Sequence, residues 1–124
     1  MGARCTFVLK HDKNNAIALY SHWGEDSMNR DIAGALAHCK PRYGDTSYAT
    51  RMFISYMIQY DVMGETGFGI YPCNPNDLGF MDHPIIIDFT NFTVGIGEDW
   101  HSFDDWIAFY GVKRLHAMDQ SSTV

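Results

Sequence analysis

Tyr20-Ser21-His22-Trp23-Gly24 is the stretch around which the rest of this chain is organised. It lies where an expected strand ends and an expected helix begins, and it brings a phenol, an imidazole and an indole close together. A junction of this kind exposes polar side chains beside the N–H groups of a helix start. Two later stretches are its expected partners, Tyr48-Ala49-Thr50-Arg51 and Glu65-Thr66-Gly67-Phe68-Gly69.

Short β-type runs predict strands on both sides of this stretch. Turn residues from His11 to Asn15 join the first two runs into a hairpin, and Asn91 turns the last two into another. The expected strands cover residues 6–9, 16–20, 68–71, 85–88 and 92–96.

Helical periodicity predicts three helices. The first follows a cap at Asp26 or Ser27 and is stopped by Pro41; the second runs from about Ser47 to Tyr60. The third starts at the Ser102 capping box and ends at Gly111. The expected buried stripes are Met28, Ile32, Ala35, Leu36 and Cys39, then Ala49, Met52, Phe53, Tyr56, Met57 and Tyr60, and finally Phe103, Trp106, Ile107 and Tyr110.

The resulting element order is ββααβββα, which predicts an α+β fold. The links between strands are short enough for hairpins, so we expect a mostly antiparallel sheet of about five strands with helices packed on one face. A single domain is expected over residues 1–112. Residues 113–124 are expected to form a loosely held C-terminal tail.

Composition excludes several classes of function. The chain has 124 residues and a net charge of -6, so it lacks the positive field that general DNA, RNA or anionic-membrane binding requires. No apolar run approaches the roughly 20 residues of a membrane span. Its three cysteines are odd in number and widely spaced, and no signal peptide is recognisable. We therefore expect a cytoplasmic protein without disulfides.

Aromatic residues make up 15% of the chain, and there are seven methionines. In a domain of this size, such a composition leaves apolar surface exposed unless chains associate. We therefore expect a homo-oligomer, either a dimer or a tetramer.

Seven residues are candidates for binding a ligand: His22, Trp23, Tyr48, Arg51, Glu65, Thr66 and Gly67. An imidazole and a guanidinium suit phosphate, and an indole or a phenol can stack on a base. Each also has a purely structural explanation. Trp23 could pack in the core, Arg51 could pair with Glu65, and Gly67 could serve a tight turn.

Other kinds of chemistry are not indicated by the motifs. Glu65 to Gly69 lacks the Gly-Lys-Ser/Thr of a phosphate-binding loop. The six histidines form no metal-binding motif, and there is no nucleophile elbow. We therefore expect no catalytic residues, no metal and no cofactor.

Five motifs occur in order along the chain: Met-Gly-x-Arg at 1–4, Tyr-x-His-Trp-Gly at 20–24, Arg-Tyr-x-Asp-x-x-Tyr-x-Thr-Arg at 42–51, Glu-Thr-Gly-Phe-Gly-Ile at 65–70 and Ile-Asp-Phe-Thr-Asn-Phe-Thr-Val at 87–94. Over residues 1–96 this combination resembles a family of small bacteriophage and bacterial proteins. Glu25 departs from it, because relatives often carry a second Gly there. The loop from Pro72 to Pro84 is also longer than in relatives.

The resemblance implies similarity to phage anti-defence sponges of the anti-CBASS type. Such proteins form oligomers and hold a cyclic nucleotide immune signal without cleaving it. The implied partner is a small anionic nucleotide ligand, and the implied setting is the host cytoplasm. Two alternatives stay open: a nucleotide-hydrolysing enzyme that uses His22 as acid or base, and a non-catalytic protein-interaction module.

Overall fold

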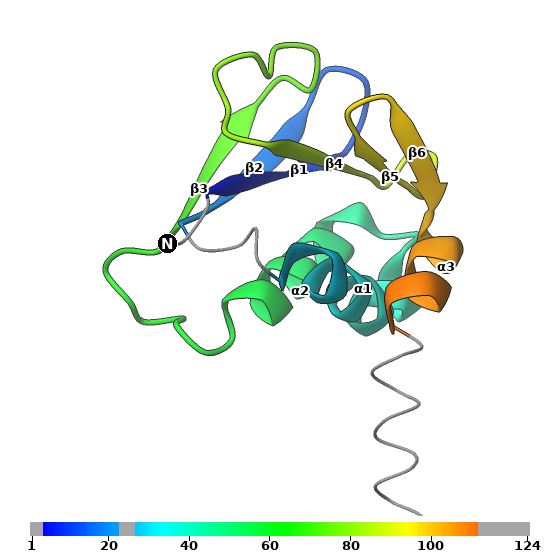
Figure 1. Cartoon of the computed structure of the whole chain (residues 1–124), viewed down its shortest axis with the longest axis horizontal. Helices are drawn as coiled ribbons and strands as arrows, with labels where there is room; N and C mark the ends of the chain where they lie inside the picture. Colours follow the sequence, from blue (N-terminus) through cyan, green and yellow to red (C-terminus); the bar gives the residue numbers. More distant parts are fainter. Residues whose placement is uncertain (1–3, 23–26, 112–124) are drawn as a thin grey trace, which may run out of the picture.

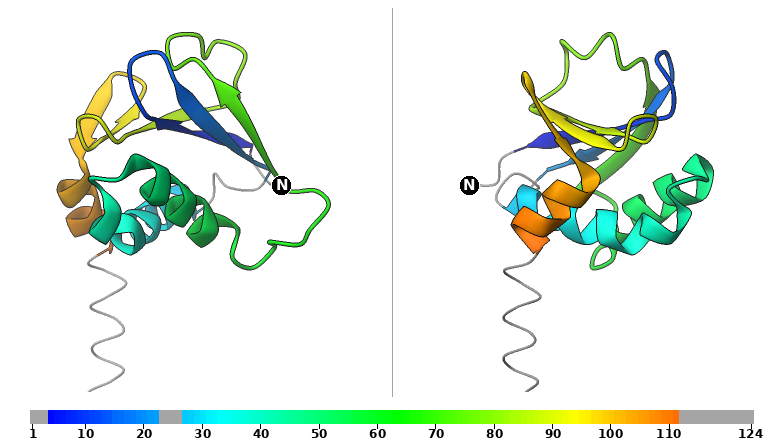
Figure 2. Two further views of the ribbon diagram at one scale, coloured as in Figure 1. Left: turned by 180° about the vertical axis from the view of Figure 1, so that it is seen from behind. Right: turned by 90° about the vertical axis from the view of Figure 1, so that its right-hand side faces the viewer.

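The computed structural model describes residues 4–22 and 27–111, which build one sheet with helices on one side (Figures 1 and 2). Trp23 and the predicted tail lie outside the described residues. The elements are β1 (Cys5–Lys10), β2 (Ala16–Ser21), α1 (Met28–Cys39), the short 3-10 turn η2 (Lys40–Arg42), α2 (Thr46–Ile58), β3 (Phe68–Cys73), β4 (Pro84–Asp88), β5 (Thr93–Ile96), β6 (Asp99–Ser102), α3 (Phe103–Trp106) and the π-helical turn η3 (Ile107–Gly111).

The sheet has six strands in the order β3-β2-β1-β4-β5-β6. All neighbours are antiparallel except β1 and β4, which run parallel. The predicted α+β class is confirmed, and the helices lie on one side of the sheet as expected (Figure 1). The prediction that β4 follows its predecessor as a hairpin partner was wrong. The chain after β3 arches over the side of the sheet opposite the helices, and β4 then pairs with β1 (Figures 1 and 2).

The predicted count of about five strands missed β6. Three of its four residues, Asp99, Trp100 and His101, are exposed, so the segment has no apolar alternation for a sequence pattern to reveal. Backbone pairing with β5 makes it a strand, and Gly97 turns the chain between them with a φ of 60°. Glycine adopts this left-handed conformation at little cost.

Alternation along the strands creates two distinct faces. Phe7 lies opposite Leu19 and Ile85, and all three side chains are fully buried against the helices. We call the face of the sheet that carries these side chains the helix-side face, and the opposite face the outer face. Burying each such side chain contributes roughly 1.5–3 kcal/mol. Leu36 of α1 and Phe53 of α2 fill the same core from the helical layer.

The predicted helical stripes are largely confirmed, because most of their residues are buried or pack against the core. Tyr60 is the exception: α2 ends at Ile58, and the Tyr60 side chain is 93% exposed. Asp45 caps α2 by accepting a hydrogen bond from the Tyr48 N–H. Ser27 does not cap α1 with its side chain, since its hydroxyl donates to Asp31 instead.

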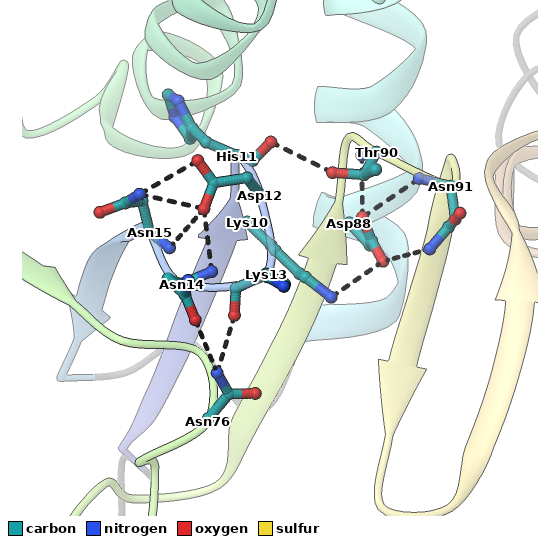
Figure 3. A network of polar contacts seen from close by, with 10 residues as sticks. All are labelled: Lys10, His11, Asp12, Lys13, Asn14, Asn15, Asn76, Asp88, Thr90 and Asn91. Carbon is teal, nitrogen blue, oxygen red and sulfur yellow. Dashed lines mark hydrogen bonds and ion pairs between the residues drawn. The ribbon is translucent and has the colours of Figure 1, made fainter.

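A buried carboxylate fixes the turn that follows β4 (Figure 3). Asp88 accepts hydrogen bonds from the N–H groups of Thr90 and Asn91 and from the Asn91 side chain. Lys10 of β1 lies 3.6 Å from the same carboxylate. The Thr90 hydroxyl then donates to the carbonyl of His11, so the network joins the β1–β2 turn to the β4–β5 turn.

We expect Asp88→Ala to lower the free energy of unfolding by about 2–4 kcal/mol, because it removes three acceptor contacts and leaves Lys10 without its partner. Asp104→Ala is the matched control. Its ion pair with Lys40 is exposed, so we expect a change within about 0.5 kcal/mol. Urea unfolding monitored by circular dichroism measures both. Equal losses in the two variants would contradict the assignment of Asp88 as the anchor.

No helix in the described ranges is long and apolar enough to cross a membrane.

Candidate functional site

Tyr20 and His22 project from the outer face at the end of β2. Tyr20 lies between Leu19 and Ser21, both of which are buried on the helix-side face. Alternation therefore places Tyr20 and His22 together on the opposite side. The Tyr20 hydroxyl lies 3.1 Å from Nδ1 of His22, and both side chains are partly exposed. The organising stretch thus delivers a paired phenol and imidazole to the outer face.

Gly67 meets His22 through the backbone. The His22 N–H donates to the Gly67 carbonyl at 2.9 Å, which continues the β2–β3 ladder one pair beyond Ser21 and Phe68. Gly67 has a φ of 102°, a conformation that other residues rarely adopt. Glu65 and Thr66, the preceding candidates, are exposed. The structure therefore places Gly67 beside His22, while no contact of Glu65 or Thr66 with His22 is found among the described residues.

Arg4 is a candidate that sequence reasoning missed. Cys5 pairs with Ser21, so the next step in the same register sets Arg4 opposite His22. Arg4 is two residues before Thr6 and so shares its outer face. It is exposed and makes no ion pair with any residue in the described ranges. The spacing of two between Arg4 and Thr6 indicates that they share a face of the strand. It does not place Arg4 beside His22 until the pairing of β1 with β2 is known.

Gly69 keeps the outer face open beside Tyr20. The two residues are directly paired, and a Cβ added to Gly69 would meet no described atom within 4 Å. Tyr71, two residues further along β3, lies on the same face. Burial raises the pKa of its hydroxyl above the ordinary value, and interaction with the Thr6 side chain partly opposes that rise. Phenol groups therefore border this opening on two neighbouring strands.

Tyr48 and Arg51 lie elsewhere, on the exposed side of α2. The Thr50 hydroxyl contacts Nε2 of His11, at the opposite end of the β1–β2 hairpin from His22. The paired strands separate these two ends by about 17 Å. Tyr48 stacks under Arg42, and Arg51 donates to Ser55. Within one protomer, Tyr48 and Arg51 are thus remote from His22.

The ion pair between Arg51 and Glu65, given above as the structural alternative to ligand binding, is not found among the described residues. Within the same ranges, no group of three or more His, Cys, Asp or Glu side chains is arranged to hold a metal ion. Trp23 follows His22 directly, so it adjoins the site in sequence, but its side chain lies outside the described residues.

Comparisons with family models, with curated protein sequences and with solved structures gave no match. The resemblance to phage anti-defence proteins therefore stays a prediction.

The side chains at this end of the outer face have the chemistry that suits an anion with an aromatic part. Arg4 supplies a fixed positive charge, and the imidazole of His22 can hydrogen-bond to an oxyanion. Tyr20 and Tyr71 supply rings and hydroxyls beside the open space at Gly69.

We expect Tyr20→Phe to lower the free energy of unfolding by about 1 kcal/mol, because it removes one side-chain hydrogen bond and little else. The ring ¹⁵N resonances of His22 should shift in the same variant, since Nδ1 loses its neighbour. Tyr60→Phe removes a hydroxyl from a side chain that is 93% exposed and serves as control. Unchanged His22 resonances in Tyr20→Phe would refute the pairing.

Gly67→Ala should destabilise the protein by about 1–3 kcal/mol, because alanine is strained at a φ of 102°. Gly69→Ala is the matched control two residues away, where the added methyl meets open space. We expect that variant to be as stable as the parent or slightly more stable. Thermal unfolding of both distinguishes a backbone requirement at Gly67 from a general need for small residues.

Proposed function

We propose that this chain is a phage-type anti-defence binding protein that sequesters a small cyclic nucleotide immune signal without cleaving it, as a homo-oligomer in the host cytoplasm. The observation that carries the proposal is the juxtaposition of Arg4, Tyr20 and His22 at one end of the outer face. A cation, a phenol and an imidazole in adjoining positions match the phosphate and base of a nucleotide.

Each residue has a distinct role in this proposal. Arg4 and His22 neutralise and hydrogen-bond a phosphate. Tyr20 or the adjoining Trp23 stacks on a base beside the open space at Gly69. Thr66 adds a polar contact near Gly67, as do the backbone groups of that turn.

Tyr48 and Arg51 fit the proposal in one way. They are remote from His22 within a protomer, so they contribute to its ligand only if another protomer presents them. A pocket shared between protomers therefore requires Arg4 of one protomer and Arg51 of the other. A pocket within one protomer requires Arg4 but not Arg51.

Hydrolysis is the second candidate, because the Tyr20–His22 pair also resembles an acid–base arrangement. A hydrolase and a sequestering protein bind the same ligand, but only the hydrolase changes it. Their products therefore distinguish them.

Purified protein incubated with a panel of cyclic di- and trinucleotides should retain one of them through gel filtration. After denaturation, liquid chromatography–mass spectrometry should recover that ligand intact. Arg4→Ala should weaken the affinity measured by calorimetry by about 10- to 100-fold, since a hydrogen bond to a charged group contributes roughly 1.5–3 kcal/mol. Arg51→Ala makes the same charge change on α2 and is the matched control.

Two outcomes decide between the functions, and a third shows whether the pocket is shared between protomers. Recovery of a linear product would contradict sequestration and support the hydrolase, and His22→Ala should then abolish turnover. If no nucleotide of the panel is retained or changed, both nucleotide functions are contradicted and the protein-interaction module remains. Equal losses in Arg4→Ala and Arg51→Ala would indicate a pocket shared between protomers.

A further inference from the structure

The two edges of the sheet differ in their protection against pairing with another strand. At one edge, β6 has four residues and begins with the charged Asp99. At the other, β3 has six residues and carries no charged side chain. Monomeric proteins usually guard an edge strand with charges, prolines or bulges. Here β3 has Pro72 alone.

The outward backbone groups of β3 can be identified from its inner pairing. The His22 N–H bonds to the Gly67 carbonyl, so Gly67 faces β2. Inward and outward orientation alternates along a strand, so Phe68, Ile70 and Pro72 direct their backbone groups away from β2. Pro72 agrees with this assignment, because a proline in a strand places its missing donor at the unpaired side.

Apolar side chains accompany this edge. Ile70 lies opposite Leu19 and so points to the helix-side face, yet it is 56% exposed because the helical layer does not reach it. The connection from α2 to β3 projects beyond the helices (Figures 1 and 2) and carries Tyr60, Val62 and Met63, which are 93%, 61% and 92% exposed. These four exposed side chains add apolar area beside the β3 edge, and a stable interface buries roughly 800 Å² per partner.

We propose that the β3 edge binds a second copy of this chain, so that two sheets join as one through antiparallel β3 strands. A two-fold axis beside Gly69 or Ile70 pairs the strand with itself and closes about four backbone hydrogen bonds. The missing N–H of Pro72 costs one possible bond on each side. No charged side chain on β3 opposes its symmetry mate.

A second copy fits this edge better than an unrelated strand does. The interface is self-complementary, because Ile70 and the apolar loop of each copy meet the same features of the other. The joined sheet does not cover the end of the outer face that carries Arg4 and His22, so each copy keeps access to its own pair. The dimer needs no ligand, and its test is independent of nucleotide binding.

Light scattering after gel filtration should give about twice the 14.1 kDa mass of the 124-residue chain. Ile70→Lys should weaken dimerisation on the order of 100-fold, because it removes a buried isoleucine from both copies. Ile70→Pro removes the same side chain without adding a charge, and it also removes the outward N–H, which the protomer's own sheet does not use. It should also yield monomers that remain folded by circular dichroism.

Amide hydrogen exchange locates the interface by residue. The N–H groups of Phe68 and Ile70 should exchange slowly in the dimer and fast in the Ile70→Lys monomer. Gly69 and Tyr71 donate towards β2 in both states, so their exchange should stay slow and serve as an internal control.

Phe109→Lys is the control for adding a charge to an exposed apolar residue, since Phe109 lies in η3 and is 66% exposed. It should dimerise like the parent chain. A parent protein that is monomeric even at about 1 mM would overturn the proposal. So would a dimer that survives both Ile70 substitutions, or one that Phe109→Lys disrupts equally.

Discussion

The rest of the structure depends on the pairing of β1 with β2, because the register of these strands sets both faces of the sheet. Cys5 opposite Ser21 sends Phe7 and Leu19 into the core. The same register sends Tyr20 and His22 to the outer face and places Arg4 beside them. A slip of one residue would exchange the two sets, exposing the core side chains and burying the polar ones. Stability and the candidate site are therefore set by one constraint.

Local chemistry fixes that register at the other end of the hairpin. Asp12 accepts hydrogen bonds from the N–H groups of Asn14 and Asn15, and the Asn15 side chain binds the same carboxylate. The hydrogen bond from the Asn15 side chain is the main reason that the pKa of Asp12 lies below its ordinary value. Asp88 then ties the hairpin to the β4–β5 turn. The hairpin is thus held at the end remote from His22, and the His22 end stays accessible.

The elements that repeat a clear period were predictable from the sequence. The run that forms β4 was correctly predicted as a strand, and the stripes of α1 and α2 pack against the core except at Tyr60. Three features were not. β6 is held by backbone pairing and leaves no side-chain pattern. The parallel contact of β1 with β4 joins segments more than seventy residues apart. Arg4 gains its position beside His22 only through the strand register.

The same limit separates Arg51 from the site within one protomer. Tyr48 and Arg51 both lie on the exposed side of α2, but spacing along a helix does not say which end of the sheet the helix covers. The contact of Thr50 with His11 decides that question.

The most direct test is a titration of ¹⁵N-labelled protein with the cyclic nucleotide that it retains, followed by amide and side-chain resonances. The largest shifts should fall on Arg4, Tyr20, His22 and the Glu65–Gly67 stretch. Shifts confined to α2, with these residues unchanged, would contradict this prediction.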